Sequence, residues 1–281
     1  MNGVAPVRGG QGRDGGERAA VQTGGKETMV TLTIDGRVAK VRDGATVLDA
    51  ARAIGVKIPT LCHHEALEPW GGCRLCLVDV TKKSWDGWCK MVVSCMYTVE
   101  EGLIVLSATD RVVATRKVVL DLLLARCPET PLIQGLAREH GIERTSYQEN
   151  PEPTDCILCG LCTRVCDHIG VSAISTVNRG AGKEVAPPFH EAPPDCIGCL
   201  ACAEICPTAC IPYQTSDVRR TIWDRTFEMV RCPHCGRAHI TKEQGAFYAG
   251  KGGVPESYFA TCDACKRTQM SKMFTSLVVA R

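Results

Sequence analysis

The chain has 281 residues, enough for one large or two to three small domains. Its 33 basic and 31 acidic residues leave a net charge of +2, which gives no electrostatic reason to expect nucleic acid or an anionic membrane as a partner. Nineteen cysteines, an odd and unusually high number without a signal segment, exclude a secreted disulfide scaffold and favour metal ligation in a reducing, cytoplasmic compartment. The sequence contains no run of 18 apolar residues, so we expect no membrane span.

The first patterned stretch begins near residue 29. Residues 1–28 are rich in glycine and charge and have almost no apolar periodicity, so we expect a disordered tail there. Apolar and polar residues alternate within residues 30–41 on both sides of Asp35-Gly36, and this pattern predicts a β-hairpin. Thr46 can cap a helix that ends at Gly55. A hairpin followed by a helix lying across it predicts a β-grasp ferredoxin fold, which we place at residues 29–107.

Cysteines follow this helix at a spacing that suits a [2Fe–2S] centre, which needs four thiolates. Two cysteines compete for the fourth place. Cys89 follows residues 81–88, which resemble a hairpin tip, whereas Cys95 continues the predicted strand 91–94, and we therefore favour Cys95. The predicted ligands are Cys62, Cys73, Cys76 and Cys95.

Two other interpretations of this region are weaker. A pair of zinc knuckles would need a second C-x2-C motif here, and none is present. His63 or His64 could replace a thiolate, as in Rieske centres. Because a fourth cysteine is available, we expect both histidines to cover the cluster or to donate hydrogen bonds to its sulfurs.

Residues 108–150 are expected to form a helical linker. Residues 110–125 mix an apolar face with charge, which predicts a long helix, and residues 131–142 predict a short amphipathic helix. The one cysteine of this linker, Cys127, has no neighbours at ligand spacing, and we expect it to fill a small apolar space.

Residues 151–214 contain two matching runs of the form C-x2-C-x2-C-x3-C. This is the bacterial ferredoxin spacing for a [4Fe–4S] cube, in which the fourth cysteine of each run ligates the cube of the other run. Structural zinc and disulfides are the alternatives, but zinc needs only four ligands and rarely repeats this spacing. The predicted sets are Cys156, Cys159, Cys162 and Cys206 for one cube and Cys196, Cys199, Cys202 and Cys166 for the other.

Two further features lie between and after the runs. Residues 171–177, between the two runs, predict a strand. Cys210 follows Cys206 by four residues without a partner at ligand spacing, and we expect it to lie in the core.

The motifs from Val30 to Pro212, with residues 61–67, Cys73-Arg74-Leu75-Cys76 and Ser94-Cys95 foremost, resemble a known family. This is the N-terminal part of the large electron-transfer subunit of the respiratory complex I NADH module, together with related subunits of NAD-linked hydrogenases, formate dehydrogenases, electron-bifurcating complexes and benzoyl-CoA reductase complexes. The resemblance implies a subunit that passes electrons between a flavin- and NAD-binding partner and another catalytic subunit. That family usually has a further [4Fe–4S] site in the linker, with one histidine and three cysteines. Here Cys127, even with His140, lacks two ligands, so we expect that site to be lost.

Residues 215–281 contain a second metal pattern after a strand-like bridge at 219–230. The motifs C-P-x-C-G and C-x2-C are separated by 26 residues and predict a zinc ribbon, or a rubredoxin-like mononuclear iron site, because both are four-thiolate tetrahedra. His234 and His239 could substitute, but four cysteines already complete the site: Cys232, Cys235, Cys262 and Cys265.

The surface of this last domain suits a protein partner better than nucleic acid. It is moderately basic but has no aromatic stacking platform, so we expect no nucleic-acid binding. Four apolar residues instead predict a docking surface for a partner subunit: Met270, Met273, Phe274 and Leu277.

The fold class expected is therefore α+β, with the four parts in the order given above. The chain shows no flavin or dinucleotide fingerprint and no substrate pocket, so we expect a non-catalytic electron-transfer component with one [2Fe–2S], two [4Fe–4S] and one zinc centre. Its expected partners are a flavoprotein NAD(H)-binding subunit and a catalytic oxidoreductase subunit. An iron–sulfur redox sensor that binds nucleic acid through the ribbon, and a free polyferredoxin, remain the alternatives.

Overall fold

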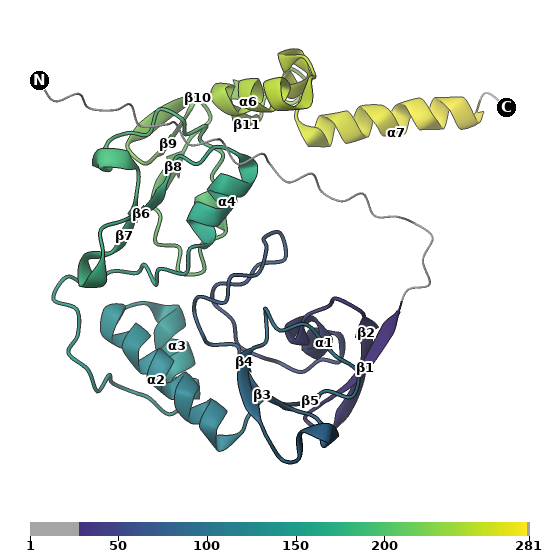
Figure 1. Ribbon diagram of the computed structural model, residues 1–281. Coiled ribbons are helices and arrows are strands. Elements are labelled where there is room, and N and C mark those ends of the chain that lie inside the picture. Colours follow the sequence, from purple (N-terminus) through teal and green to yellow (C-terminus); the bar gives the residue numbers. More distant parts are fainter. Residues whose placement is uncertain (1–27, 280–281) are drawn as a thin grey trace, which may run out of the picture.

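The computed structural model describes residues 28–279, and the side chains of residues 28–275 (Figure 1). Apart from Thr28, the predicted disordered tail lies outside the described residues. None of the helices in the described part combines the length and the hydropathy that a membrane crossing would need.

A five-stranded mixed sheet with one helix forms the first part of the fold. The predicted hairpin is confirmed, with Ile34 paired to Arg37 across a turn whose two residues both have positive φ. The strand order is β2-β1-β5-β3-β4, and only the β1–β5 pair is parallel. The elements are β1 (Met29–Ile34), β2 (Arg37–Arg42), α1 (Val47–Ala53), β3 (Leu77–Thr81), the 3-10 helix η1 (Lys83–Trp85), β4 (Lys90–Val93) and β5 (Ile104–Leu106).

The predicted helix α1 covers this sheet. Thr46 caps it through a reciprocal capping box with Asp49, which satisfies main-chain donors of the first turn. Its buried residues, Val47 and Leu48 among them, belong to the same apolar cluster as the inward-facing residues of β1 and β3. The cluster includes Cys76 and Cys95, so two of the predicted ligands lie at the end of a sheet core.

Two helices form the linker, as predicted. These are α2 (Asp110–Arg126) and α3 (Pro131–Glu139). Leu120 and Ile133 are fully buried between them. Cys127 lies in the same cluster and is fully buried, and burial raises the pKa of its thiol to about 11, in keeping with the apolar role predicted for it.

The region of the two cysteine runs consists of short elements. They are α4 (Leu161–Ile169), β6 (Ser175–Val177), η2 (Gly180–Gly182), β7 (Glu184–Ala186), η3 (Pro188–His190) and α5 (Ala201–Glu204). The strand predicted at 171–177 is wrong for its first four residues. The N–H groups of Val171 and Ser172 donate to the carbonyl of Cys166, at 3.1 and 3.2 Å, and close the end of α4 instead. A strand can begin only after this cap.

The last part contains a four-stranded antiparallel sheet of order β11-β10-β9-β8 and two helices. The single strand-like bridge predicted at 219–230 is wrong, because Trp223 and Asp224 both have positive φ and turn the chain into a hairpin. The elements are β8 (Tyr213–Thr215), β9 (Arg219–Ile222), β10 (Arg225–Arg231), β11 (Ala238–Thr241), α6 (Lys242–Gly252), η4 (Glu256–Ala260) and α7 (Asp263–Val279).

Candidate metal centres

The four cysteines predicted for the [2Fe–2S] centre gather as two close pairs. The N–H of Cys73 donates to Sγ of Cys62 at 3.3 Å, and the Sγ atoms of Cys76 and Cys95 are 3.4 Å apart. Cys62, Cys76 and Cys95 are each only 1% exposed. A long loop after α1 brings Cys62 and Cys73 to the start of β3, where Cys76 lies, and the end of β4 brings Cys95.

Each pair contains one thiol of lowered and one of raised pKa. A hydrogen bond from the Cys62 thiol lowers the pKa of Cys73 to about 5, and one from the Cys95 thiol lowers the pKa of Cys76 to about 6. The same bonds raise the pKa of Cys62 and Cys95, and burial adds to both increases. Four cysteine sulfurs brought together from separate parts of the chain fit an iron–sulfur group.

Cys89 and the two histidines have other partners. Cys89 lies 3.7 Å from Nη2 of Arg111, whose partner is the buried carboxylate of Asp79. His63 Nε2 lies 3.1 Å from Nη1 of Arg52, and Nδ1 of His64 accepts the N–H of Ala66. The geometry therefore favours Cys95 over Cys89 as the fourth ligand.

The two cysteine runs line two separate cavities. Each cavity takes three cysteines from one run and the fourth cysteine from the other, which is the arrangement that cross-ligation of two cubes requires. The first cavity contains Cys156, Cys159, Cys162 and Cys206, and the second contains Cys166, Cys196, Cys199 and Cys202.

The loops of both runs repeat the same backbone. Leu158 and Gly160 in the first run, and Gly198 and Leu200 in the second, have φ values between 53° and 70°. A left-handed leucine is costly, and such strain is typical of functional sites. The twists bring the N–H of Gly198 to 3.5 Å from Sγ of Cys196. Main-chain donors aimed at ligand sulfurs fit a negatively charged cluster.

Burial is the largest influence on the pKa of most cysteines of the two runs, whereas a hydrogen bond from Cys210 lowers the pKa of Cys156 and Cys206. Burial raises the pKa of Cys159 to about 11 and that of Cys162 and Cys202 to about 12. The indole N–H of Trp223 acts in the opposite direction on Cys202, and it has no oxygen or nitrogen acceptor. An N–H left to point at a sulfur is consistent with a sulfur-rich group in the second cavity.

Cys210 packs against the core, as predicted, but the prediction that it has no partner is wrong. Its Sγ lies 3.5 Å from Sγ of Cys206, and its thiol also hydrogen bonds to Cys156. It is half-buried and lines the first cavity as a fifth cysteine. The spacing of three residues between Cys206 and Cys210, the same as that between the last two cysteines of each run, was the signal in the sequence.

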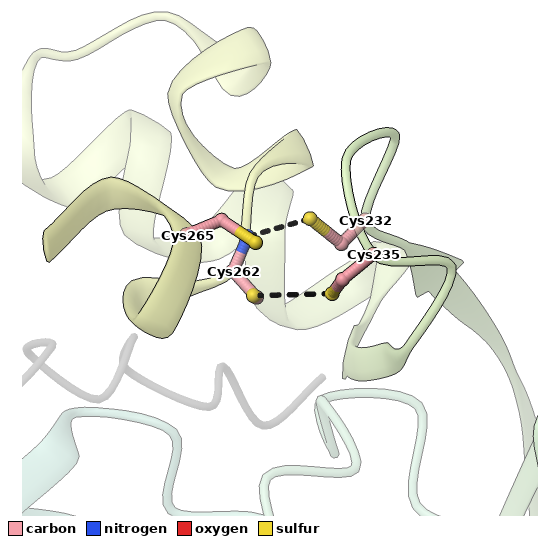
Figure 2. Close-up of side chains that lie close together, drawn as sticks. All are labelled: Cys232, Cys235, Cys262 and Cys265. Atoms are coloured by element: carbon pink, nitrogen blue, oxygen red, sulfur yellow. Dashed lines mark hydrogen bonds between the residues drawn. The ribbon is translucent and has the colours of Figure 1, made fainter. Parts of the chain in front are cut away.

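The four C-terminal cysteines form a compact group (Figure 2). The Sγ atoms of Cys232, Cys235, Cys262 and Cys265 all lie within 4.8 Å of one another. A zinc ion with sulfurs at about 2.3 Å sets those sulfurs about 3.8 Å apart. The Cys235 and Cys262 sulfurs are 3.7 Å apart, so the group needs little adjustment to hold such an ion.

The protein backbone supports this group. The N–H of Cys262 donates to Sγ of Cys232 at 3.5 Å and lowers the pKa of that thiol to about 5. Gly236, with φ of 71°, allows the tight turn between β10 and β11. His234 and His239 instead contact Gln269 and the carbonyl of Phe259, so neither substitutes for a cysteine.

Arginine side chains bind main-chain carbonyls inside the cysteine loops, a feature that the sequence did not reveal. Arg116 and Arg220 are buried, and both have a pKa lowered by desolvation. Each arginine places positive charge beside a site that would carry negative charge. The contacts are Arg116 with Leu75 and Leu77, Arg164 with Cys62, Arg126 with Cys156, Arg220 with Gly198 and Arg225 with Cys196.

Two loops take their names from the clusters proposed for them: residues 62–76 are the [2Fe–2S] loop, and residues 156–162 are the first cube loop. They share one apolar cluster, which contains both Cys62 and Cys159. Arg164 of α4 donates to the carbonyl of Cys62 at 3.0 Å and lies 5.7 Å from the ring centre of Trp70. That ring also lies against Gly160, which follows Cys159. The two sites are therefore neighbours.

The predicted docking surface on α7 is exposed as far as the structure describes it. Met270, Met273 and Phe274 are all exposed, whereas the side chain of Leu277 lies outside the described residues. His140, which could have joined Cys127, binds the carbonyl of Leu136 through Nδ1.

Comparison with known proteins also identifies an iron–sulfur domain in this chain. Residues 27–110 match the family model of the 2Fe-2S iron-sulfur cluster binding domain. The chain is 28% identical over 234 residues to an NADH-quinone oxidoreductase subunit of Rhizobium meliloti, covering 74% of this chain and 27% of that protein. It is 32% identical over 215 residues to the HndD subunit of the NADP-reducing hydrogenase of Solidesulfovibrio fructosivorans, covering 66% of this chain and 36% of that protein.

A solved structure, the NAD+-reducing [NiFe]-hydrogenase in the H2-reduced state, matches with a TM-score of 0.50 and 28% identity, covering 57% of this chain and 75% of that chain. The chain spans only about a third or less of the length of the curated relatives named above. The sequence resemblance is confirmed. The chain carries a 2Fe-2S iron-sulfur cluster binding domain and resembles a subunit of NADH-quinone oxidoreductase, the HndD subunit of an NADP-reducing hydrogenase and an NAD+-reducing [NiFe]-hydrogenase.

Proposed function

We propose that this chain is an iron–sulfur electron-transfer subunit of a multi-subunit oxidoreductase. It relays single electrons between an NAD(H)- and flavin-binding partner and another redox catalytic subunit. The names of its relatives, an NADH-quinone oxidoreductase subunit and an NADP-reducing hydrogenase subunit, support both ends of this relay. A flavin partner suits the relay, because a flavin can accept a hydride and release its two electrons one at a time.

Three groups of residues would hold the iron–sulfur clusters, which supply one-electron chemistry when bound. In the β-grasp domain proposed at residues 29–107, the close pairs Cys62–Cys73 and Cys76–Cys95 would each hold one iron of a [2Fe–2S] centre. In the domain proposed at residues 151–214, the two cavities would hold two [4Fe–4S] centres, with the ligand sets predicted above.

The continuity of the sites is the observation that carries this proposal. Cys62 and Cys159 belong to one apolar cluster, so the [2Fe–2S] loop and the first cube loop belong to the same packed core. The two cube cavities in turn share α4, which contributes Cys162 to one and Cys166 to the other. The three sites therefore form a series through the described part of the chain.

The four-cysteine group has a structural role in this proposal. Its four sulfurs complete a tetrahedral zinc site and leave no open position for a substrate. In the domain proposed at residues 215–281, the ion would join the turn after β10 to the start of α7 and so fix the exposed face of that helix.

Anaerobic isolation of the full chain tests the proposal. We expect about ten iron and ten acid-labile sulfide atoms per chain, one zinc, and three reduced centres by EPR. We also expect the centres to be reduced by NADH only when a flavoprotein partner is added. A chain without acid-labile sulfide, or one that turns over a substrate alone, would refute the assignment.

A further inference from the structure

We infer that Cys210 is an alternative ligand at the first cube site, able to take the position of Cys206. The inference rests on the proposed function, because it assumes a cluster in the first cavity. It concerns a residue that the ferredoxin spacing leaves without a role.

The first cavity contains five thiols, although a cube needs only four ligands. The Sγ atoms of Cys206 and Cys210 are 3.5 Å apart, and Cys210 also hydrogen bonds to Cys156. Ala209, with φ of 51°, turns the chain between them, and its N–H donates to the carbonyl of Cys206 at 3.2 Å. This turn brings two side chains from the same loop to the same cavity.

The second cavity provides a natural comparison. Cys166 holds the position there that Cys206 holds in the first cavity, and the residue four places after Cys166 is Gly170. Among the described residues that line the second cavity, the cysteines are the four predicted ligands and no more. The fifth thiol therefore distinguishes the first site from the second, although the two runs have the same spacing.

The exchange is chemically balanced without any added reactant. A bond from iron to Sγ of Cys210 forms and the bond to Sγ of Cys206 breaks. The proton of the Cys210 thiol passes to the Cys206 sulfur 3.5 Å away, and the electron count of the cluster does not change. Both cysteines are half-buried, whereas Cys159 and Cys162 are buried, so this corner of the first site lies closer to solvent than theirs.

Alanine variants of the full chain, prepared anaerobically, test this exchange through iron content and EPR. We expect C206A and C210A each to keep the iron content of the wild type, with a changed EPR line shape of one [4Fe–4S] centre in C206A. We expect the double variant C206A/C210A to lose the iron of the first site. The matched control C166A should lose iron from the second site, because Gly170 offers no replacement sulfur. Circular dichroism of each variant reports whether it is folded.

Alkylation of the folded holoprotein gives a second measurement. In the wild type, iodoacetamide should label Cys210, whereas in C206A the same thiol should be protected because it holds iron. The inference would be overturned if C206A and the double variant lost the same amount of iron. It would also be overturned if Cys210 were labelled equally in C206A and in the wild type. Either result would leave the electron-transfer function intact. A wild-type chain without acid-labile sulfide would instead overturn that function.

Discussion

The choice between Cys89 and Cys95 shows how single residues decide the proposed [2Fe–2S] site. Cys95 follows the end of β4 and is buried 3.4 Å from Cys76, whereas Cys89 contacts Arg111 beside the η1 turn. The difference arises because the end of β4 carries Cys95 into the core, whereas the segment after η1 leaves Cys89 only half-buried. Serine variants of the two cysteines can therefore distinguish their roles.

We expect C95S to abolish the [2Fe–2S] EPR signal and C89S to retain it. C73A should also remove this signal while both [4Fe–4S] signals remain, because Cys73 lies with Cys62 and not in either cube cavity. EPR of the reduced full chain is the measurement. Retention of the signal in C95S with its loss in C89S would show that Cys89 is the ligand.

Arg116 is expected to raise the reduction potential of the proposed [2Fe–2S] centre. It is buried and donates to the carbonyls of Leu75 and Leu77 on either side of Cys76, so its positive charge stabilises the more negative, reduced cluster. Loss of about 1.5 kcal/mol of this stabilisation corresponds to a potential lower by about 60 mV.

Redox titration of R116Q followed by EPR measures this shift. K117Q is the matched control, since it removes the same charge from the exposed neighbouring position on α2, where solvent and salt screen it. An unchanged potential in R116Q, or an equal shift in both variants, would contradict the role of the buried charge.

At the scale of elements, the C-terminal sheet and α6 hold the loop of residues 196–202, which is called the second cube loop after the cluster proposed for it. Thr241, the N-cap of α6, donates its hydroxyl to the carbonyl of Ile197 at 2.5 Å, and Phe227 of β10 is almost fully buried in the cluster that contains Cys196 and Cys202. β8 lies across the boundary proposed between residues 214 and 215. The sheet and the cube loop therefore stabilise each other.

Gly198 lies at this contact, and we expect G198A to be destabilising. An added Cβ would lie 2.8 Å from the Phe227 ring and 3.0 Å from the Thr241 methyl group, at a φ of 66°. Overpacking of this kind costs about 1–3 kcal/mol. We expect a lower melting temperature and a weakened EPR signal of the second cube.

G180A is the control for backbone strain alone. Gly180 has a similar φ of 61°, but nothing lies within 4 Å of its added Cβ. If G180A and G198A lose the same stability, close packing against the sheet does not explain the effect.

At the scale of the whole molecule, the proposed sites follow one another from the first sheet to the last helix. The linker helices α2 and α3 supply the apolar cluster that joins the first two sites, and α4 joins the two cube cavities. The four-cysteine group lies beyond them, at the start of α7, as the position of α7 in Figure 1 illustrates. This order separates the proposed conducting part from the proposed docking part.

We therefore expect C262S to lose zinc and to keep iron and acid-labile sulfide. Cys262 contributes to the four-sulfur group alone, while the sheet and the Thr241 contact hold the second cube loop without the ion. Analysis of zinc, iron and acid-labile sulfide in the purified variant measures these contents. Limited proteolysis should show faster cleavage near α7. Loss of iron together with zinc would contradict this separation.

The sequence alone determined the features that depend on neighbouring residues. The hairpin at Asp35-Gly36, the Thr46 cap and the two linker helices follow from local backbone preferences, and the structure confirms them. The cysteine spacings likewise act over two or three residues, so they predict ligand sets, and the cavities bring the cysteines of each set together.

Only the tertiary structure decided which distant groups meet those cysteines. Arg164 reaches the carbonyl of Cys62 across 102 residues, and Arg220 of β9 reaches the loop at Gly198; neither contact has a periodicity that a sequence could display. Cys210 joined the first cavity because a left-handed turn at Ala209 directs it there. Such contacts arise from packing between elements, whereas spacing within a motif is set by the chain itself.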